Sequence, residues 1–120
     1  MTEIAKLLNP QFAVADAENP KFSYTGDELY LSFVDWHEEE VRVVFKNCVA
    51  VKWQNADSTG PEDRDDCTYE IHNSEWLKLH LDQRMIEPNE KHRHFKLCFN
   101  AAGVLEVIAT EMELDAQPGH

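Results

Sequence analysis

The stretch Leu29-Tyr30-Leu31-Ser32-Phe33-Val34 decides the fold class, because large apolar side chains recur in it at every second position. A period of two places Leu29, Leu31 and Phe33 on one face of a half-buried β-strand. After an interruption at residues 35–40, the alternation resumes and keeps one parity at six positions: Val41, Val43, Phe45, Val49, Val51 and Trp53. Strand structure is therefore predicted for this whole region.

Two arrangements fit residues 41–53. They form one long bent strand, or two strands joined at a bulge near Lys46-Asn47, where an apolar residue is missing from the alternation. In both arrangements the same six apolar side chains lie on one face.

The clearest helix signal covers residues 74–85. Asn73 or Ser74 can cap the first turn, and Glu75 complements the helix dipole there. Residues at helical spacing follow: Trp76, Leu77, His80 and Leu81. We expect the helix to end near Met85, ahead of a proline.

The remaining segments supply shorter elements. Residues 1–8 are predicted to form a short helix, and Asn19-Pro20 a turn. Residues 68–71 form a short strand, whereas 95–99 and 104–112 form a terminal hairpin. Strands, one helix and a hairpin in this order lack the strand–helix–strand alternation of a parallel sheet.

We therefore predict a single α+β domain over residues 1–120, with a curved, mainly antiparallel β-sheet and the helix of residues 74–85 packed on it. Residues 1–23 form a peripheral N-terminal segment and 115–120 a frayed tail. The side chains expected to be largely buried are Leu31, Phe33, Val43, Phe45, Val51, Trp53, Trp76, Leu81, Leu97 and Phe99.

The chain is strongly acidic, with 11 Lys and Arg against 23 Asp and Glu and a formal charge of −12. Such a field repels phosphate backbones and anionic lipid, so nucleic-acid and membrane binding are disfavoured and a basic partner is attracted. The three cysteines, Cys48, Cys67 and Cys98, are odd in number and widely spaced. We read them as reduced thiols and, with no signal-peptide pattern at the start, expect a cytoplasmic protein.

His92 and His94 are spaced to share a strand face and could hold a metal. The neighbouring cations oppose this, and no third ligand follows from the spacing, so a solvated strand face is the alternative and we expect no metal or cofactor. No glycine-rich elbow surrounds a serine or cysteine. We therefore predict no enzymatic activity, with a cysteine-dependent enzyme as a third possibility.

Two acidic stretches carry most of the charge. Residues 35–40 hold four negative charges, and residues 57–66 hold five negative charges and one positive. Both flank the same strand region, so both could project from one end of the sheet as a docking surface, or simply keep their loops solvated. The candidate partner-binding residues are Asp35, Trp36, Glu38, Glu39, Glu40, Asp57, Glu62, Asp63, Asp65 and Asp66.

Three stretches carry a family resemblance: residues 26–31 leading to 41–45, residues 68–77, and residues 94–100 continuing to 103–108. Over residues 24–114 the chain resembles the small, acidic, strand-rich immunity proteins of bacterial toxin–immunity systems. The resemblance implies a cytosolic antidote that binds and blocks a cognate toxin, commonly a nuclease with a basic surface. It assigns no individual residue, because the toxin-contacting positions differ between such families. The alternative is an adapter or structural domain that forms a homodimer through an exposed strand edge.

Overall fold

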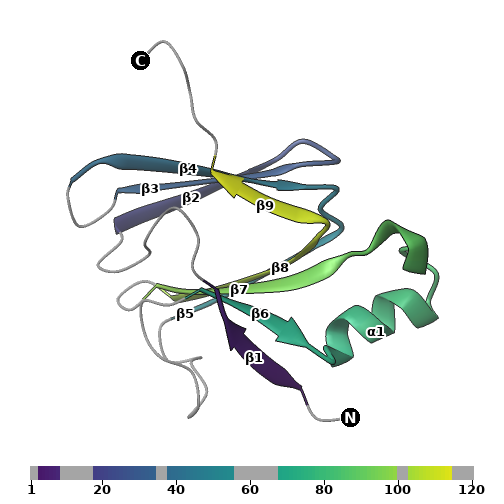
Figure 1. The fold of residues 1–120 in the computed structure, drawn as a ribbon. Helices are drawn as coiled ribbons and strands as arrows, with labels where there is room; N and C mark the ends of the chain where they lie inside the picture. Colours follow the sequence, from purple (N-terminus) through teal and green to yellow (C-terminus); the bar gives the residue numbers. More distant parts are fainter. Residues whose placement is uncertain (1–2, 9–17, 35–37, 56–67, 100–102, 115–120) are drawn as a thin grey trace.

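The computed structural model describes residues 3–8, 18–34, 38–55, 68–99 and 103–114. In it the chain forms two antiparallel β-sheets stacked face to face, with one α-helix on the outside of the larger sheet (Figure 1). The predicted α+β class, with mainly antiparallel strands and one principal helix on a sheet, is confirmed. The strands are shared between two sheets, however, and the core lies between them.

The larger sheet has five strands in the order β1-β6-β7-β8-β5. Their bounds are β1 Ile4–Leu7, β6 Thr68–His72, β7 Arg93–Phe99, β8 Gly103–Ala109 and β5 Ala50–Asn55. The smaller sheet has four strands in the order β2-β3-β4-β9. Their bounds are β2 Glu18–Tyr24, β3 Leu29–Val34, β4 Glu40–Lys46 and β9 Glu111–Leu114. Every neighbouring pair in both sheets is antiparallel.

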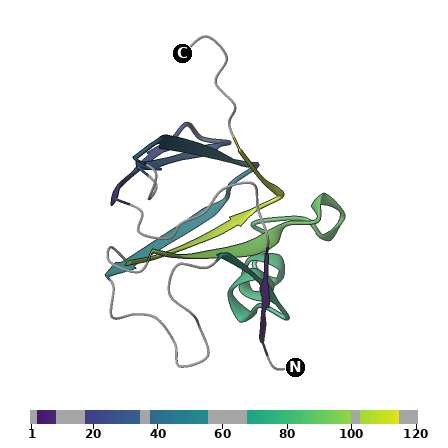
Figure 2. The same ribbon diagram turned by 60° about the vertical axis from the view of Figure 1, so that its left-hand side comes forward.

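The chain crosses between the sheets twice at one end of the sandwich. It passes from β4 to β5 through residues 47–49, and from β8 to β9 at Thr110, as Figure 2 shows for the second crossing. Because β4 and β5 belong to different sheets, the prediction that all six apolar residues of 41–53 share one face is wrong. Each strand instead points its own apolar side chains into the space between the sheets.

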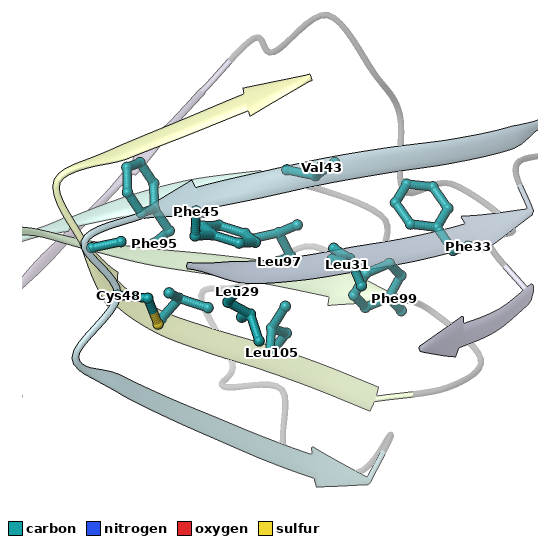
Figure 3. Packing of buried hydrophobic residues seen from close by; sticks show 12 residues of the cluster. Leu29, Leu31, Phe33, Val43, Phe45, Cys48, Phe95, Leu97, Phe99 and Leu105 are labelled. Carbon is teal, nitrogen blue, oxygen red and sulfur yellow. The ribbon is translucent and has the colours of Figure 1, made fainter. Parts of the chain in front are cut away.

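Alternate residues of the central strands fill that space (Figure 3). The rings of Phe33 and Phe99 meet edge to face at 5.5 Å between centroids, and those of Phe45 and Phe95 lie 5.9 Å apart. Each fully buried apolar side chain of this size contributes roughly 1.5–3 kcal/mol. The other buried members of the core are Leu29, Leu31, Val43, Cys48, Leu97, Leu105, Val107 and Ala109.

Most of the predicted core is confirmed, and its outer members are more exposed than expected. Leu31, Phe33, Val43, Phe45, Leu97 and Phe99 are buried. Trp53, Trp76 and Leu81 are half-buried. The predicted burial of Val51 is wrong, because this side chain is 40% exposed. Among the described strands β5 has a neighbour on one side only, so Val51 points inward at an exposed flank of the sandwich.

Both predictions for the N-terminal region are wrong. Residues 4–7 form β1, which pairs antiparallel with β6, rather than a helix. All four residues of β1 are exposed, so the backbone pairing and not apolar burial holds the strand. Asn19-Pro20 lies inside β2 instead of in a turn, within a register shift between Glu18 and Lys21. A proline is tolerated there because β2 is an edge strand with an irregular ladder.

The helix α1 covers Glu75–Asp82, three residues less than predicted at its C-terminal end. The predicted cap at Ser74 is confirmed, since its Oγ accepts a hydrogen bond from the Leu77 amide. The helix ends because Arg84 adopts a left-handed φ of 57°, while the amide of Met85 donates to the His80 carbonyl. No helix among the described residues has the length and apolar character needed to cross a membrane.

Candidate protein-binding surface

Three of the acidic residues predicted to bind a partner lie together at the tip of the β3–β4 hairpin. Glu38 and Glu39 precede β4, and Glu40 is its first residue, paired with Val34 of β3. All three residues are exposed. The tip therefore presents three consecutive carboxylates on the surface.

The other predicted partner-binding residues are outside the described residues: Asp35, Trp36, Asp57, Glu62, Asp63, Asp65 and Asp66. The described strand ends that lead to them can still be located. Asn55 ends β5 and pairs with Gly103, which also pairs with Phe99. The ring of Phe99 packs on Phe33, one residue before the end of β3. The strand ends leading into both acidic stretches therefore lie at the same end of the sandwich, which we call the acidic end.

Apolar side chains are exposed along one flank of the molecule, where the edge strands β2 and β5 meet. Phe22 and Tyr24 of β2 are 38% and 55% exposed, and Val49 and Val51 are 38% and 40% exposed. The half-buried Trp53 joins the two strands, because its ring lies 5.1 Å from that of Phe22. We call these five residues the β2/β5 flank. At this flank, apolar side chains that border the core are accessible to solvent.

The flank is fixed at one end by hydrogen bonds to the backbone. The hydroxyl of Tyr24 donates to the carbonyls of Gly26 and Cys48, at 2.8 and 3.1 Å. The amide of Cys48 donates to the Asp27 carbonyl at 2.7 Å. The β2–β3 turn is thereby hydrogen-bonded to the crossing from β4 to β5. These bonds fix the backbone that carries the apolar side chains at this end of the flank.

A buried polar relay lies on the outer face of the five-stranded sheet, under α1. Oγ of Ser74 and Nδ1 of His94 are 2.6 Å apart, and Nε2 of His94 is 2.7 Å from Oε1 of Glu106. Ser74 and His94 are buried, and Trp76 packs edge to face on the His94 ring. The sequence reading of the His94 side as a solvated face is wrong, because the helix covers it.

The electrostatics of the relay fix the direction of its hydrogen bonds. Burial raises the pKa of Glu106, but the hydrogen bond from His94 and the positive charge of Lys52 outweigh it and hold this pKa below its usual value. The Glu106 carboxylate therefore accepts a hydrogen bond from the Nε2–H group of His94. In the neutral imidazole this tautomer leaves Nδ1 to accept a hydrogen bond from the Ser74 hydroxyl. Lys52 lies 4.0 Å from Glu106 and 4.2 Å from the centroid of Trp76.

Serine, histidine and carboxylate in this order are also the parts of a nucleophilic catalytic site. Here Oγ of Ser74 also accepts a hydrogen bond from the Leu77 amide, which caps α1. The amide of Glu75, which could have stabilised an oxyanion, donates to a carboxylate oxygen of Glu3 at 2.7 Å. A hollow of about 300 Å³ beside Ser74 is open to solvent. The relay links the N-terminus of α1 to β7 and β8 through these hydrogen bonds.

The two histidines considered above as a metal pair, His92 and His94, point to different partners. His92 precedes β7, and its Nε2 lies 3.1 Å from the carbonyl oxygen of Asn47. His94 is engaged in the relay. Among the described residues, no group of three histidine, cysteine or acidic side chains is placed to hold a metal ion.

A bidentate ion pair stabilises the β6–β7 ladder. Nε and Nη2 of Arg93 donate to the two carboxylate oxygens of Glu70, at 3.0 and 2.7 Å. This hydrogen bonding lowers the pKa of Glu70 and raises that of Arg93. The sequence offered no signal for the pair, because its members lie 23 residues apart.

No family model, curated protein or solved structure matches the chain.

Proposed function

We propose that this chain is a non-catalytic protein-binding domain of the immunity type, which binds a basic toxin in the cytoplasm and neutralises it. The observation that carries the proposal is the acidic end. Three consecutive exposed carboxylates, Glu38 to Glu40, lie at the end of the sandwich from which the second acidic stretch also departs. The resemblance of residues 24–114 to immunity proteins points to the same function.

Simple electrostatics supports this proposal. A charge of −12 on a small domain repels nucleic acid and attracts cationic surfaces at long range. A nuclease that grips phosphate presents such a surface, and carboxylates projecting from one end of a rigid sandwich can occupy it in place of phosphate. Clustered charges of this kind mainly accelerate association, with a steep dependence on salt.

The proposal is tested by neutralising the hairpin tip. In the chain with Glu38→Gln, Glu39→Gln and Glu40→Gln, we expect binding to the protein encoded by the adjacent gene to weaken at least tenfold in low salt, mainly through slower association. The matched control carries Asp82→Asn, Glu87→Gln and Glu111→Gln, three exposed acids at scattered positions. It removes the same total charge, so it should weaken binding much less. Equal losses in both variants, or binding indifferent to salt, would contradict the proposal.

The alternative function is an adapter that forms a homodimer through a strand edge. The open edge of β5 and the exposed apolar side chains beside it favour this alternative. Two copies that each carry a charge of −12 repel one another, however, so self-association should be weak in low salt. Sedimentation at two salt concentrations separates the two functions, because a stable dimer in low salt would favour the adapter.

A further inference from the structure

We propose that the outer edge of β5, which has no strand partner among the described residues, binds an extended segment of the basic partner. This segment pairs as a sixth strand and inserts its apolar side chains into the β2/β5 flank. This inference rests on the proposed function and names the way in which the partner docks. Exposed strand edges offer backbone hydrogen-bonding groups on their open side, and binding by strand addition is a recurrent mode of recognition.

The edge of β5 is the most suitable of the four sheet edges. It runs for six residues in unbroken register with β8, without proline or glycine. The other edge strands are poorer templates. β2 contains Pro20 and a register shift, while β1 and β9 have four residues each. Among the described strands, β5 has no partner besides β8.

The side chains next to this edge favour an apolar, alternating segment. Val51 and Trp53 pair with the buried residues Val107 and Leu105, so they face the interior and not the outer surface of the sheet. An added strand would place every second side chain beside them and over Phe22 of the opposite sheet. These apolar groups are now exposed, and covering them removes water from their surface. A gain of about 25 cal/mol accompanies each Å² of apolar area buried.

The negative charge of this chain favours a basic segment, rather than a second copy of the chain, as the occupant of the β5 edge. The flank ends at the β2–β3 turn, where Asp27 is exposed and Glu28 is partly exposed, and its other end leads toward the acidic end. The only cation of β5, Lys52, points to the outer face, where Glu106 and the Trp76 ring hold its ammonium group. A second copy would instead bring another charge of −12 to the same edge.

The first experiment compares two variants that add the same charge at different places. Val51→Lys puts an ammonium group on the flank, whereas Leu79→Lys puts one on the exposed side of α1. Both positions are already exposed, so both variants should fold, which melting confirms. We expect Val51→Lys to weaken binding of the adjacent gene's protein at least tenfold, and Leu79→Lys to change it less than twofold. Equal effects of the two variants would overturn the strand-addition proposal.

This comparison separates the present inference from the proposed function. If neutralising Glu38 to Glu40 weakens binding and Val51→Lys does not, the acidic end binds the partner and β5 does not. If Val51→Lys weakens binding and the neutralised tip does not, the flank binds and the acidic end is only solvated.

A second experiment needs no natural partner. The probe is a blocked nine-residue peptide of alternating valine and threonine with an arginine at each end, and the control peptide has proline in place of the central valine. We expect the first peptide alone to slow hydrogen exchange of the β5 amides, and Val51→Lys to abolish this protection. Unchanged exchange in β5, or protection confined to β1, β2 or β9, would overturn the proposal.

Discussion

The side-chain amide of Asn47 donates a hydrogen bond to the hydroxyl of Thr110 across 63 residues of sequence, at 3.0 Å. Asn47 lies in the crossing from β4 to β5 and Thr110 in the crossing from β8 to β9, so the bond joins these two crossings to each other. Thr110 also donates to the Lys46 carbonyl through its hydroxyl and through its backbone amide. These hydrogen bonds among Lys46, Asn47 and Thr110, which we call the clasp, join the two crossings at the end of the sandwich opposite the acidic end.

The clasp predicts a difference between two variants of Asn47. This residue has a left-handed φ of 51°, which asparagine and glycine tolerate better than alanine does. Both Asn47→Ala and Asn47→Gly lose the side-chain hydrogen bond, which contributes about 1 kcal/mol. Only the alanine adds backbone strain of about 1 kcal/mol. Denaturant unfolding should rank wild type above Asn47→Gly and Asn47→Ala last; an alanine variant as stable as the glycine variant would contradict this account.

The relay under α1 predicts that Ser74→Ala is destabilising by about 2–3 kcal/mol. The change removes the helix cap, which contributes about 1 kcal/mol, and it leaves Nδ1 of the buried His94 without its hydrogen-bond partner. Ser74→Thr keeps the hydroxyl and should retain most of the stability. Thermal melting of the two variants makes the comparison. A loss below about 0.5 kcal/mol in Ser74→Ala would mean that the relay contributes nothing to the attachment of the helix.

The Glu70–Arg93 pair predicts a pH dependence of stability. Because the pKa of Glu70 is lower in the folded state than its ordinary value of 4.5, the unfolded chain takes up a proton more readily. The stabilisation is complete above that ordinary value and is lost as the pH falls through the lower, folded pKa. We expect Glu70→Gln to be less stable than wild type at pH 7 and to approach it in acid. The exposed residue Glu87 provides the control, and an unfolding curve of Glu87→Gln parallel to wild type at every pH is the expected result.

The central strands could be predicted from the sequence because their packing leaves a periodic signal. Leu29, Leu31 and Phe33 of β3 and Phe95 and Leu97 of β7 all face the same core, so an apolar residue is needed at every second position. The edge strand β1 leaves no such signal. β1 is exposed along its whole length and is held by backbone pairing with β6, which any non-proline sequence can supply.

Periodicity also fails to assign strands to sheets. Val43 of β4 and Trp53 of β5 fit the same every-second-residue alternation in the sequence, and both point into the core. They reach it from different sheets, however, which the alternation does not reveal. The relay was missed for a similar reason. Ser74 and His94 are 20 residues apart, and only the packing of α1 on β7 brings them together. The acidic tip, by contrast, could be predicted directly, because a charge cluster between two strands has to lie at the surface.

The backbone of Glu38 predicts a conflict between stability and binding at the acidic end. Glu38 has a left-handed φ of 65°, a conformation that costs a residue other than glycine or asparagine about 1 kcal/mol. Glu38→Gly should relieve this strain and raise the melting temperature, while it removes one carboxylate from the proposed docking surface and slows association with a basic partner. Glu39→Gly is the matched control, since it removes the same charge next to Glu38 without a left-handed φ to relieve. The control should melt lower than wild type, by roughly the 0.5–1 kcal/mol that a glycine costs in entropy. If both glycine variants melt below wild type, Glu38 is not strained; if Glu38→Gly is stabilised and binds as fast as wild type, the strain at this position has no connection with partner binding.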